Sequence, residues 1–380
     1  MTGPVPLRVL PVDNRPRRRD WLDVPAIVHQ GDPAFVAQLR LMESMRISQQ
    51  HNPFFTFGEA GLFVALRGDR PVGRISAQIN HRHRQFHAAA SGHFGFFDCR
   101  DDFDAAKALV DAAACWLRAR GADHMEGPYS FSVNEECGLL IEGFDTPPAM
   151  LMNHARPHAA ALLDRLGFDK AMDTFAYRMT RLDTPLRIAT FADPLRADPR
   201  IRIRPLDTSR FEAEVHTVID IFNDAWSGNW GFVPFSEAEI VAMARELKPF
   251  YRGEYGRIVE IDGEPAALML AVPDINGLIK PFGGRLLPFN WARLAFGLWR
   301  QTARSARIPL MGIRKRHQNS LAAVGVLALL VSDFLVEARK HRLDWVEFSW
   351  VLESNKPMNA LARMTAGDPV KRYRLYRRAL

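Results

Sequence analysis

The stretch RIVEIDGEPAALMLAV, residues 257–272, decides the fold, because two apolar runs flank an Asp-Gly turn. Asp-Gly between apolar runs is a strong hairpin signal. A similar passage lies earlier in the chain, where strand-like residues 62–66 lead through the turn RGDRP, residues 67–71, into residues 72–78. Both turns end in a charged residue and proline, which indicates an internal repeat.

The repeat extends outward from the two hairpins. Alternating segments 7–12 and 201–206 precede them, each followed by helical stretches: 25–45 in the first half, then 211–226 and 237–247 in the second. Each half continues with a helix and a strand, at 104–120 and 122–126 and again at 321–340 and 344–350. We therefore expect two α/β (α+β) domains with one plan, spanning residues 1–185 and 200–380 and joined by a linker near 181–200. Two unrelated modules are the alternative.

The composition narrows the class of protein. With 47% hydrophobic and 24% charged residues, the 380-residue chain matches ordinary globular proteins, which excludes disordered and fibrous classes. The net charge is +7, and the last ten residues hold five cations, Lys371, Arg372, Arg374, Arg377 and Arg378. Such a field favours a phosphate-bearing ligand, nucleic acid or an anionic membrane surface.

Cysteine usage and hydropathy bear on location. Three cysteines without a CxxC pattern favour a reducing compartment and argue against a disulfide framework or a cysteine-rich metal site. The N-terminal residues lack an apolar stretch after 17–19, and the run 320–336 is too polar to span a membrane. We expect a cytoplasmic protein; a peripheral contact with the inner membrane stays open.

The element order resembles that of the GNAT acyltransferase superfamily. The closing passage VEFSWVLESN, residues 346–355, followed by a helix at 357–364, carries this resemblance most clearly. It implies two GNAT-like N-acyltransferase domains in tandem, each with a mixed, largely antiparallel central sheet flanked by helices. It also implies acyl-CoA as a co-substrate, with no permanently bound cofactor.

The segment MGIRKRHQNSLAAVG, residues 311–325, is the candidate CoA loop, because it follows a strand and opens a long helix. Backbone amides at a helix start bind phosphates, and three consecutive cations add charge. The cofactor-binding candidates are Arg314, Lys315, Arg316, Asn319, Gly325 and, after the last strand, Asn355. The corresponding first-half loop, 98–104, is acidic, so we place CoA in the second half. A solvated basic turn is the alternative. The GNAT tyrosine that protonates the leaving thiolate is replaced by Ala362.

The long segment 127–158 mixes polar groups with Phe and Met and begins where a strand ends, a usual place for a site in α/β folds. His154 is the candidate general base, because imidazole titrates near physiological pH, and Glu135 would orient either His154 or the acceptor. Glu353 is the second candidate. A packing loop with a satisfied histidine is the alternative.

Further candidates contact substrate rather than transfer protons. They are Tyr129, Asn134 and Asn153 in the first half, and Trp226, Trp230, Asp274 and Asn276 in the second. The tryptophans also fit a purely structural role. The histidines in 81–87 lack nearby carboxylates or cysteines, so we interpret them as a charged strand end and expect no metal.

Four segments together resemble a bacterial family of tandem GNAT-like acyltransferases that includes the bacterial ceramide synthase. They are GPYSFSVNEECGLLIEGFDTPP, NDAWSGNWGFVP, PDIN and SWVLESN. The resemblance implies transfer of a long acyl chain from acyl-CoA to the amine of a sphingoid base, 3-oxosphinganine, in sphingolipid biosynthesis. No nucleic-acid partner is expected. The alternatives are a catalytically decayed lipid- or CoA-binding protein, or an N-acyltransferase for another amine such as an amino acid.

Overall fold

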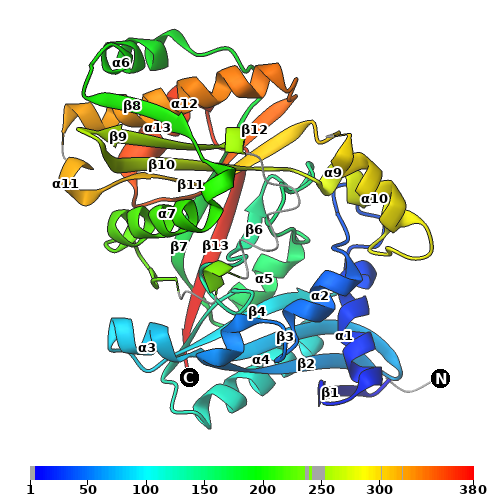
Figure 1. Ribbon diagram of the computed structural model, residues 1–380. Coiled ribbons are helices and arrows are strands. Elements are labelled where there is room, and N and C mark those ends of the chain that lie inside the picture. Colours follow the sequence, from blue (N-terminus) through cyan, green and yellow to red (C-terminus); the bar gives the residue numbers. More distant parts are fainter. Residues whose placement is uncertain (1–4, 236–238, 242–252, 301, 319) are drawn as a thin grey trace. The chain divides into compact units, whose positions relative to one another are not determined.

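The computed structural model describes residues 5–235, 239–241, 253–300, 302–318 and 320–380 (Figure 1). The chain folds as two compact units. Unit 1 comprises residues 1–173, 279–293 and 371–380, and unit 2 comprises residues 174–278 and 294–370. Unit 1 thus takes two segments from the second half of the sequence, where the predicted boundaries place none.

Unit 1 is built on strands in the order β1-β2-β3-β4-β5-β13. These are β1 (Leu7–Pro11), β2 (Gly58–Arg67), β3 (Arg70–Asn80), β4 (Ser91–Cys99), β5 (His124–Gly127) and β13 (Lys371–Ala379), with the short β6 (Leu139–Glu142) paired to β13. β4 and β5 run parallel and the other pairs antiparallel. The helices are α1 (Arg15–Val28), α2 (Arg40–Arg46), η1 (Pro53–Thr56), α3 (His81–His87), α4 (Phe103–Arg118) and α5 (His158–Arg165).

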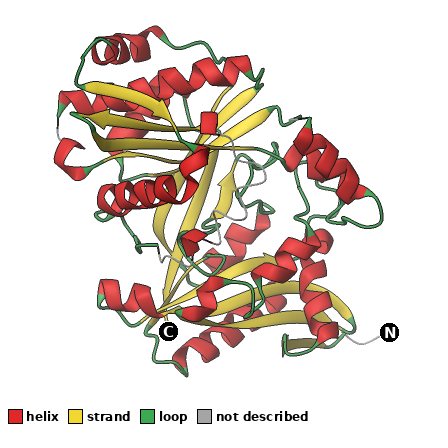
Figure 2. Cartoon of the chain, in the orientation of Figure 1, coloured by secondary structure: helices red, strands yellow, loops and turns green. Residues whose placement is uncertain are grey.

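Unit 2 repeats this plan with the strand order β7-β12-β11-β10-β9-β8. These are β7 (Asp169–Met179), whose residues 169–173 belong to unit 1, β12 (Trp345–Leu352), β11 (Ser305–Ile313), β10 (Glu264–Pro273), β9 (Gly256–Ile261) and β8 (Ile201–Pro205). β11 and β12 form its parallel pair. The helices are α6 (Leu186–Arg196), η2 (Thr208–Arg210), α7 (Phe211–Trp226), η3 (Gly253–Tyr255), α9 (Asn276–Ile279), η4 (Lys280–Phe282), α10 (Asn290–Trp299), α11 (Lys315–Gln318), α12 (Leu321–Lys340) and α13 (Lys356–Ala366), although η4 and the start of α10 belong to unit 1. α7 covers one face of the sheet, and α12 with α6 covers the other (Figure 2).

Each unit takes its last strand from the other half of the sequence. β13, at the C-terminus, pairs with β5, where Tyr376 lies opposite Gly127. β7, which precedes the predicted linker, pairs with β12, where Met179 lies opposite Val346. The two halves of the sequence therefore exchange a strand.

The predicted hairpins are confirmed and have a local cause. Asp262 and Gly263 both have positive φ angles, 53° and 81°, which suits a tight turn between right-twisted strands. Gly68 has the same property, with φ of 59° in the first-half turn. The predicted helices 211–226 and 321–340 are also confirmed, the latter capped by the Ser320 hydroxyl, which accepts from the Ala323 amide at 3.2 Å.

Two local predictions are wrong. A continuous helix over 25–45 does not form: α1 begins earlier, where the Asn14 side chain accepts from the Arg17 amide, and Gly31 and Pro33 interrupt the helical pattern before α2. Residues 81–87 form helix α3 rather than a strand end, because the Asn80 side chain caps the His83 amide. The linker 181–200 contains α6. The predicted helix 237–247 lies largely outside the described residues.

Apolar burial explains α6. Its Ile188 and Ala192 are fully buried in one core cluster with Val326, Leu329 and other residues of α12. In unit 1, a cluster around Trp21, Phe54, Phe96 and Phe131 plays the corresponding role between α1 and the sheet. Within the described ranges, no helix combines the length and apolarity needed to cross a membrane.

Candidate functional site

The two parallel strand pairs separate before they end. In unit 1 the pairing of β4 with β5 covers residues 91–93 and 124–126, although β4 continues to Cys99. In unit 2 the pairing of β11 with β12 covers residues 305–308 and 345–348, although β11 continues to Ile313. Each unit therefore has one central strand whose second half no longer pairs with its parallel neighbour. We call this side of the strand its released edge.

In unit 1 the loop that follows β5 bonds to the released edge of β4. The Tyr129 amide donates to the Phe94 carbonyl at 2.8 Å, and a Cβ on Gly95 would overlap the Tyr129 carbonyl oxygen. That oxygen also accepts from the Gln78 side chain at 3.1 Å. Phe131 then packs on Phe96, with ring centroids 5.0 Å apart. Backbone and aromatic groups thus fill this edge.

In unit 2 the corresponding segment, residues 310–313 of β11, pairs with β10 on one side. β12 turns away and pairs with β7 at Val351 and Leu352. A Cβ on Gly312 would lie 2.5 Å from the ring of Trp226, which stacks on Phe222. The predicted substrate residue Trp226 therefore lies against the released strand. Trp230 lies half-buried in the turn after α7.

The helices that follow these strands start differently. Asp102 caps α4, accepting from the Ala105 amide at 3.1 Å, and it also forms an ion pair with Arg67. The Arg67 guanidinium is the main reason that the pKa of Asp102 is lowered. A carboxylate thus already occupies the helix start in unit 1, whereas the neutral Ser320 hydroxyl caps α12 in unit 2. Phosphate would be repelled by the first and accepted by the second.

The three predicted CoA cations lie between β11 and α12, and all have carboxylate neighbours. Arg314 pairs with Asp220 at 2.5 Å, and the Lys315 amide donates to Asp224 at 2.7 Å. Arg316 pairs with Glu264 at 2.6 Å, and both side chains are more than half exposed. The Arg316–Glu264 pair is exposed, so solvent weakens it and Glu264 would yield readily to phosphate.

Three other positions of the predicted CoA loop have separate outcomes. Asn319 lies outside the described residues. Gly325 is inside α12, where a Cβ would lie 2.6 Å from Leu195 of α6, so close helix packing accounts for this glycine. Asn355 caps α13, with its side chain accepting from the Met358 amide at 3.2 Å. Ala362 is buried in the core of unit 2.

His154 is buried in unit 1, and its ring is held by Asp32 rather than by the predicted Glu135. Nε2 lies 2.9 Å from the Asp32 carboxylate, and Nδ1 is buried without a hydrogen-bond partner among the described residues. Burial lowers the pKa of His154 below its ordinary value, although Asp32 acts in the opposite direction. Burial also opposes ionisation of Asp32, but hydrogen bonds from His154, Ala34 and Arg156 outweigh it and hold the pKa at about 2. A neutral imidazole with one nitrogen fixed and the other free can accept a proton.

His29 completes a cluster with these two residues. One ligand atom each from His29, Asp32 and His154 lie within 4.8 Å of one another, and His29 also bonds Asp98 at 3.2 Å, as metal-bound histidines often do. Arg156 contacts the same Asp32 oxygen at 3.1 Å, however, and so neutralises it. The donor set is compatible with a divalent ion only if Arg156 withdraws.

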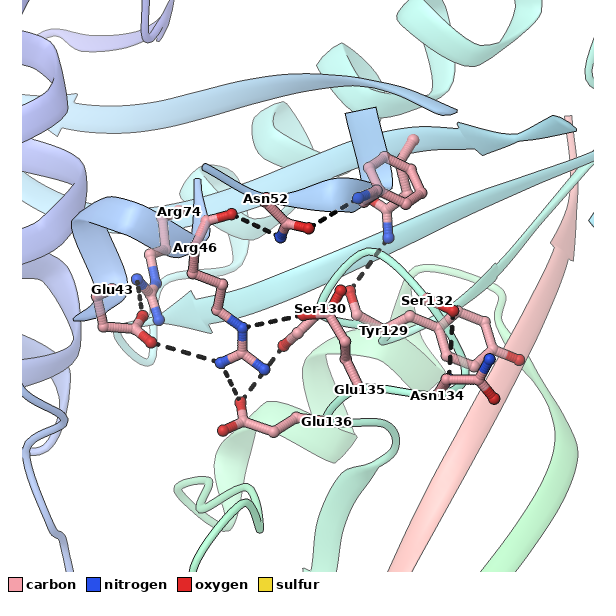
Figure 3. A network of polar contacts seen from close by, with 12 residues as sticks. Glu43, Arg46, Asn52, Arg74, Tyr129, Ser130, Ser132, Asn134, Glu135 and Glu136 are labelled. Carbon is pink, nitrogen blue, oxygen red and sulfur yellow. Dashed lines mark hydrogen bonds and ion pairs between the residues drawn. The ribbon is translucent and has the colours of Figure 1, made fainter. Parts of the chain in front are cut away.

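Glu135 belongs to a different network, drawn in Figure 3. The buried guanidinium of Arg46 bonds Glu135 at 3.2 Å, Glu136 at 3.0 Å and Glu43 at 3.4 Å. Burial opposes the charge of Arg46, but these carboxylates raise its pKa above the ordinary value. This network ties the loop 130–136 to α2, so Glu135 positions the loop (Figure 3).

The other predicted first-half substrate residues also anchor the segment 127–158. The buried Tyr129 hydroxyl donates to Glu126 at 2.8 Å. The Asn153 side chain donates to the Gly138 carbonyl at 2.7 Å. The Asn134 amide donates to the Ser132 hydroxyl at 3.3 Å (Figure 3).

In unit 2, Asp274 is buried at the end of β10. It accepts from the Asn276 amide at 3.0 Å and from the Ser305 hydroxyl at 3.1 Å. Burial, with a smaller contribution from Glu347, raises the pKa of Asp274 to about 6. Asp274 therefore changes charge near neutral pH, as general bases do.

Sequence reasoning missed the buried charges around Asp274. Glu347 is fully buried and pairs with Arg178 at 2.8 Å. Arg307, opposite Glu347 in the β11–β12 pairing, donates to the Ser349 hydroxyl at 2.9 Å and stacks on Trp350. The signal in the sequence that could have indicated them is one charged residue inside each of two otherwise apolar strands, Arg307 in β11 and Glu347 in β12. Glu353, the second candidate base, lies partly buried just after β12.

The basic C-terminal residues are bonded within unit 1. Arg372 pairs with Glu142, Arg374 with Asp173 and Arg377 with Glu126, at 3.2, 2.9 and 2.7 Å. The Lys371 ammonium donates to the Thr146 carbonyl at 2.7 Å, and Arg378 donates to Leu166. These cations form a strand rather than a free tail, which weakens the case for lipid binding there.

Comparison with known proteins follows this geometry. No protein-family model matches the chain. It is 39% identical over 375 residues to the bacterial ceramide synthase of Caulobacter vibrioides, covering 98% of each chain. It is 36% identical to Protein YghO of Escherichia coli, covering 97% of this chain and 94% of YghO.

Solved structures match the fold. A tandem GNAT protein from the clavulanic acid biosynthesis pathway superposes with a TM-score of 0.59 at 13% identity, covering 98% of each chain. The predicted tandem GNAT fold and the predicted family are both confirmed. The chain belongs to the family of tandem GNAT-like acyltransferases that contains the bacterial ceramide synthase and YghO.

Proposed function

We propose that this protein is an acyl-CoA-dependent N-acyltransferase that joins a long acyl chain to the amine of a sphingoid base, 3-oxosphinganine. The observation that carries the proposal is the 39% identity to the bacterial ceramide synthase along 98% of both chains. The two GNAT-like units provide a fold suited to acyl transfer from CoA. No cofactor besides acyl-CoA is required by this chemistry.

Acyl-CoA binds in unit 2 in this proposal. Two differences between the units support the assignment. In unit 1, residues 127–131 bond to the free edge of β4 and a carboxylate caps α4. Among the described residues of unit 2, no such loop bonds to the matching edge of β11, and the neutral Ser320 caps α12. The proposed contacts with the phosphate and amide groups of acyl-CoA are made by Arg314, Lys315, Arg316, Asn319 and Asn355. Gly325 is proposed only as the packing residue that fixes α12.

His154 is the proposed general base, and Asp32 takes the orienting role first given to Glu135. Nδ1 accepts a proton from the substrate ammonium, and the resulting amine attacks the thioester carbonyl. As the tetrahedral intermediate collapses, its nitrogen releases its second proton to solvent, and the CoA thiolate takes the proton held by His154 and leaves as the thiol. Backbone N–H groups of a central strand would stabilise the oxyanion. Glu353 remains the alternative base.

Substrate contacts are proposed for both units. They are Tyr129, Asn134 and Asn153 in unit 1, and Trp226, Trp230, Asp274 and Asn276 in unit 2. Because both substrates carry long chains, a cytoplasmic location with a peripheral membrane contact is part of the proposal.

A direct assay tests this function. Purified protein is incubated with a long-chain acyl-CoA and 3-oxosphinganine, and mass spectrometry follows the amide while a thiol reagent follows CoA release. We expect equal amounts of both products. A parallel reaction with free amino acids tests the wider N-acyltransferase alternative. If neither amine is acylated, the activity is excluded for these substrates.

A binding protein without catalysis is the second candidate. The buried Ala362, which stands where GNAT enzymes have a tyrosine acid, favours it. Native mass spectrometry separates the two, because a decayed protein would hold acyl-CoA or the base without forming the amide.

A further inference from the structure

Helix α10 and the loop before it expose an unusual number of large apolar side chains. Leu287 and Phe289 are 76% and 75% exposed, and on the helix Trp291, Phe296 and Trp299 are 57%, 59% and 72% exposed. We call residues 285–300 the α10 surface. Isolated exposed apolar residues are ordinary, but a group within sixteen residues usually marks an interaction site.

The apolar side chains gather on one side of the helix. At about 100° per residue, Trp291, Trp299 and Phe296 span an arc of about 140°, which also contains the exposed Ala292 and Ala295. The opposite side holds the buried Gly297 and the half-buried Leu294, and the half-buried Leu298 borders the arc beside Trp291. Gly297 faces Leu278, which a Cβ would approach to 3.4 Å. The helix thus packs inward through small and aliphatic residues and presents its aromatic side outward.

Cations border the aromatic arc. Arg285, Arg293 and Arg300 are exposed, and their side chains form no hydrogen bond or ion pair with the described residues. The neighbouring Lys280 and Arg304 are instead bonded, to Pro33 and Asp344. The sequence contains no Asp or Glu from residue 275 to residue 332. The α10 surface is therefore aromatic and uniformly positive.

We propose that the α10 surface docks on an anionic lipid bilayer. Trp and Phe side chains favour the boundary between headgroups and acyl chains, and arginines beside them contact lipid phosphates. A second copy of this chain is a poorer partner, because a two-fold contact would bring the same unpaired arginines together. This surface, and not the C-terminal strand, then carries the membrane contact.

The docking proposal stands apart from the acyl-transfer proposal. It predicts binding of full-length protein to vesicles without acyl-CoA or sphingoid base. His154→Ala should therefore bind vesicles as the wild type does, whatever its effect on turnover. Failure to bind vesicles would remove the peripheral membrane contact from the proposed function but would leave the acyl-transfer proposal intact.

Vesicle sedimentation tests the proposal, with one set of phosphatidylglycerol-containing vesicles and one of phosphatidylcholine alone. We expect the wild type to prefer the anionic set and to lose that preference in high salt. The variant R285Q/R293Q/R300Q should partition about a hundredfold more weakly, because each cation near an anionic surface contributes about tenfold or less. The variant W291S/F296S/W299S should lose at least tenfold on both sets.

Leu186→Ser is the matched control, because Leu186 is 83% exposed on α6, outside the α10 surface. It should bind like the wild type. Hydrogen exchange of the wild type, with and without vesicles, needs no variant and should show protection confined to 285–300. Vesicle binding that is absent, or equal in the wild type and both triple variants, would overturn the proposal. The proposal would also be overturned if sedimentation velocity showed a dimer of the wild type and a monomer of W291S/F296S/W299S.

Discussion

The two units share one strand plan and use its centre in opposite ways. In unit 1 the loop after β5 bonds β4 through Tyr129, and Phe131 joins the aromatic core. In unit 2 the matching part of β11 faces Trp226 and leads into a basic loop. One strand plan therefore supports two different uses of its central strand: in unit 1 that strand anchors a long loop, and in unit 2 it leads into the basic loop.

The buried titratable groups follow the same division. Unit 1 holds His29, His154 and their carboxylate partners, and unit 2 holds Asp274 beside the Glu347–Arg178 pair. In the proposed function, the general base belongs to unit 1 and the acyl-CoA loop belongs to unit 2. Variants in each unit test whether the two units have these different roles.

The largest effect is expected from His154. His154→Ala should lower kcat about 10²–10⁴-fold, the range for loss of a general base, while acyl-CoA binding stays unchanged. Asp32→Asn should lower kcat less, because the ring remains but its tautomer is no longer fixed. Steady-state kinetics together with equilibrium acyl-CoA binding separate these effects.

The exposed His51 of unit 1 provides the control. His51→Ala should leave kcat at the wild-type value. Wild-type turnover in His154→Ala, with loss in Glu353→Ala, would move the base to unit 2 and end the proposed division of labour.

The fold was largely predictable because its signals are local. Turns that contain Gly and Asp, alternating strands and apolar helical patterns indicated both hairpins and the helices 211–226 and 321–340 at nearly their observed limits. The exchanged strands were not predictable, because a strand's sequence shows that it pairs but not with which neighbour. The prediction of one helix over 25–45 is wrong because it follows the apolar spacing and disregards Gly31 and Pro33, which interrupt the helix.

The site was predicted less well, for a related reason. The choice of His154 as base rests on its side-chain chemistry and stays a prediction. Its hydrogen-bond partner Asp32 lies 122 residues away in the chain, and nothing local links the two. Glu135 was chosen because it was close in sequence, and it pairs with Arg46 instead. Burial of Glu347 and Arg307 depends on the packing of several strands, so neither residue stood out.

Glycine substitutions probe how tightly each strand edge is closed. Gly95→Ala should destabilise the protein by about 3 kcal/mol, because the new methyl group meets the Tyr129 carbonyl of the closing loop. Gly312→Ala meets only the Trp226 side chain, which is half-buried and can move, so we expect about 1 kcal/mol. Chemical denaturation gives both values. Equal losses would show that the two edges are equally closed.

The CoA loop is probed by replacing Arg314, Lys315 and Arg316 together with alanine. The dissociation constant for acyl-CoA should rise about tenfold to a hundredfold, because each tenfold step corresponds to about 1.4 kcal/mol of lost phosphate contact. Calorimetry measures it without turnover. Arg200→Ala is the control, because Arg200 is also an exposed, paired cation of unit 2. Unchanged affinity in a folded triple variant would place CoA in unit 1.

The smallest expected effect is a pH response of opposite sign in the two units. In unit 1, burial lowers the pKa of His83 from its ordinary 6.5 to about 4, and burial also lowers the pKa of His93 and His154. The unfolded chain binds these protons more tightly, so unit 1 should lose stability as the pH falls from 6.5 towards 4. In unit 2, burial raises the pKa of Asp274 from 3.8 to about 6. The folded form then binds the proton more tightly, so this group adds stability as the pH falls below 6.

Hydrogen exchange at pH 7 and pH 5, corrected for intrinsic rates, resolves the two responses by comparing amides of β4 with amides of β11. We expect β4 to lose protection at pH 5 and β11 to keep or gain it. Asp274→Asn should remove the gain in β11 without changing β4, because the amide does not titrate. His83→Gln should reduce the loss in β4 for the same reason. Parallel losses in both strands would mean that the units open together, and the division between a proton-transfer unit and an acyl-donor unit would then have no counterpart in their stability.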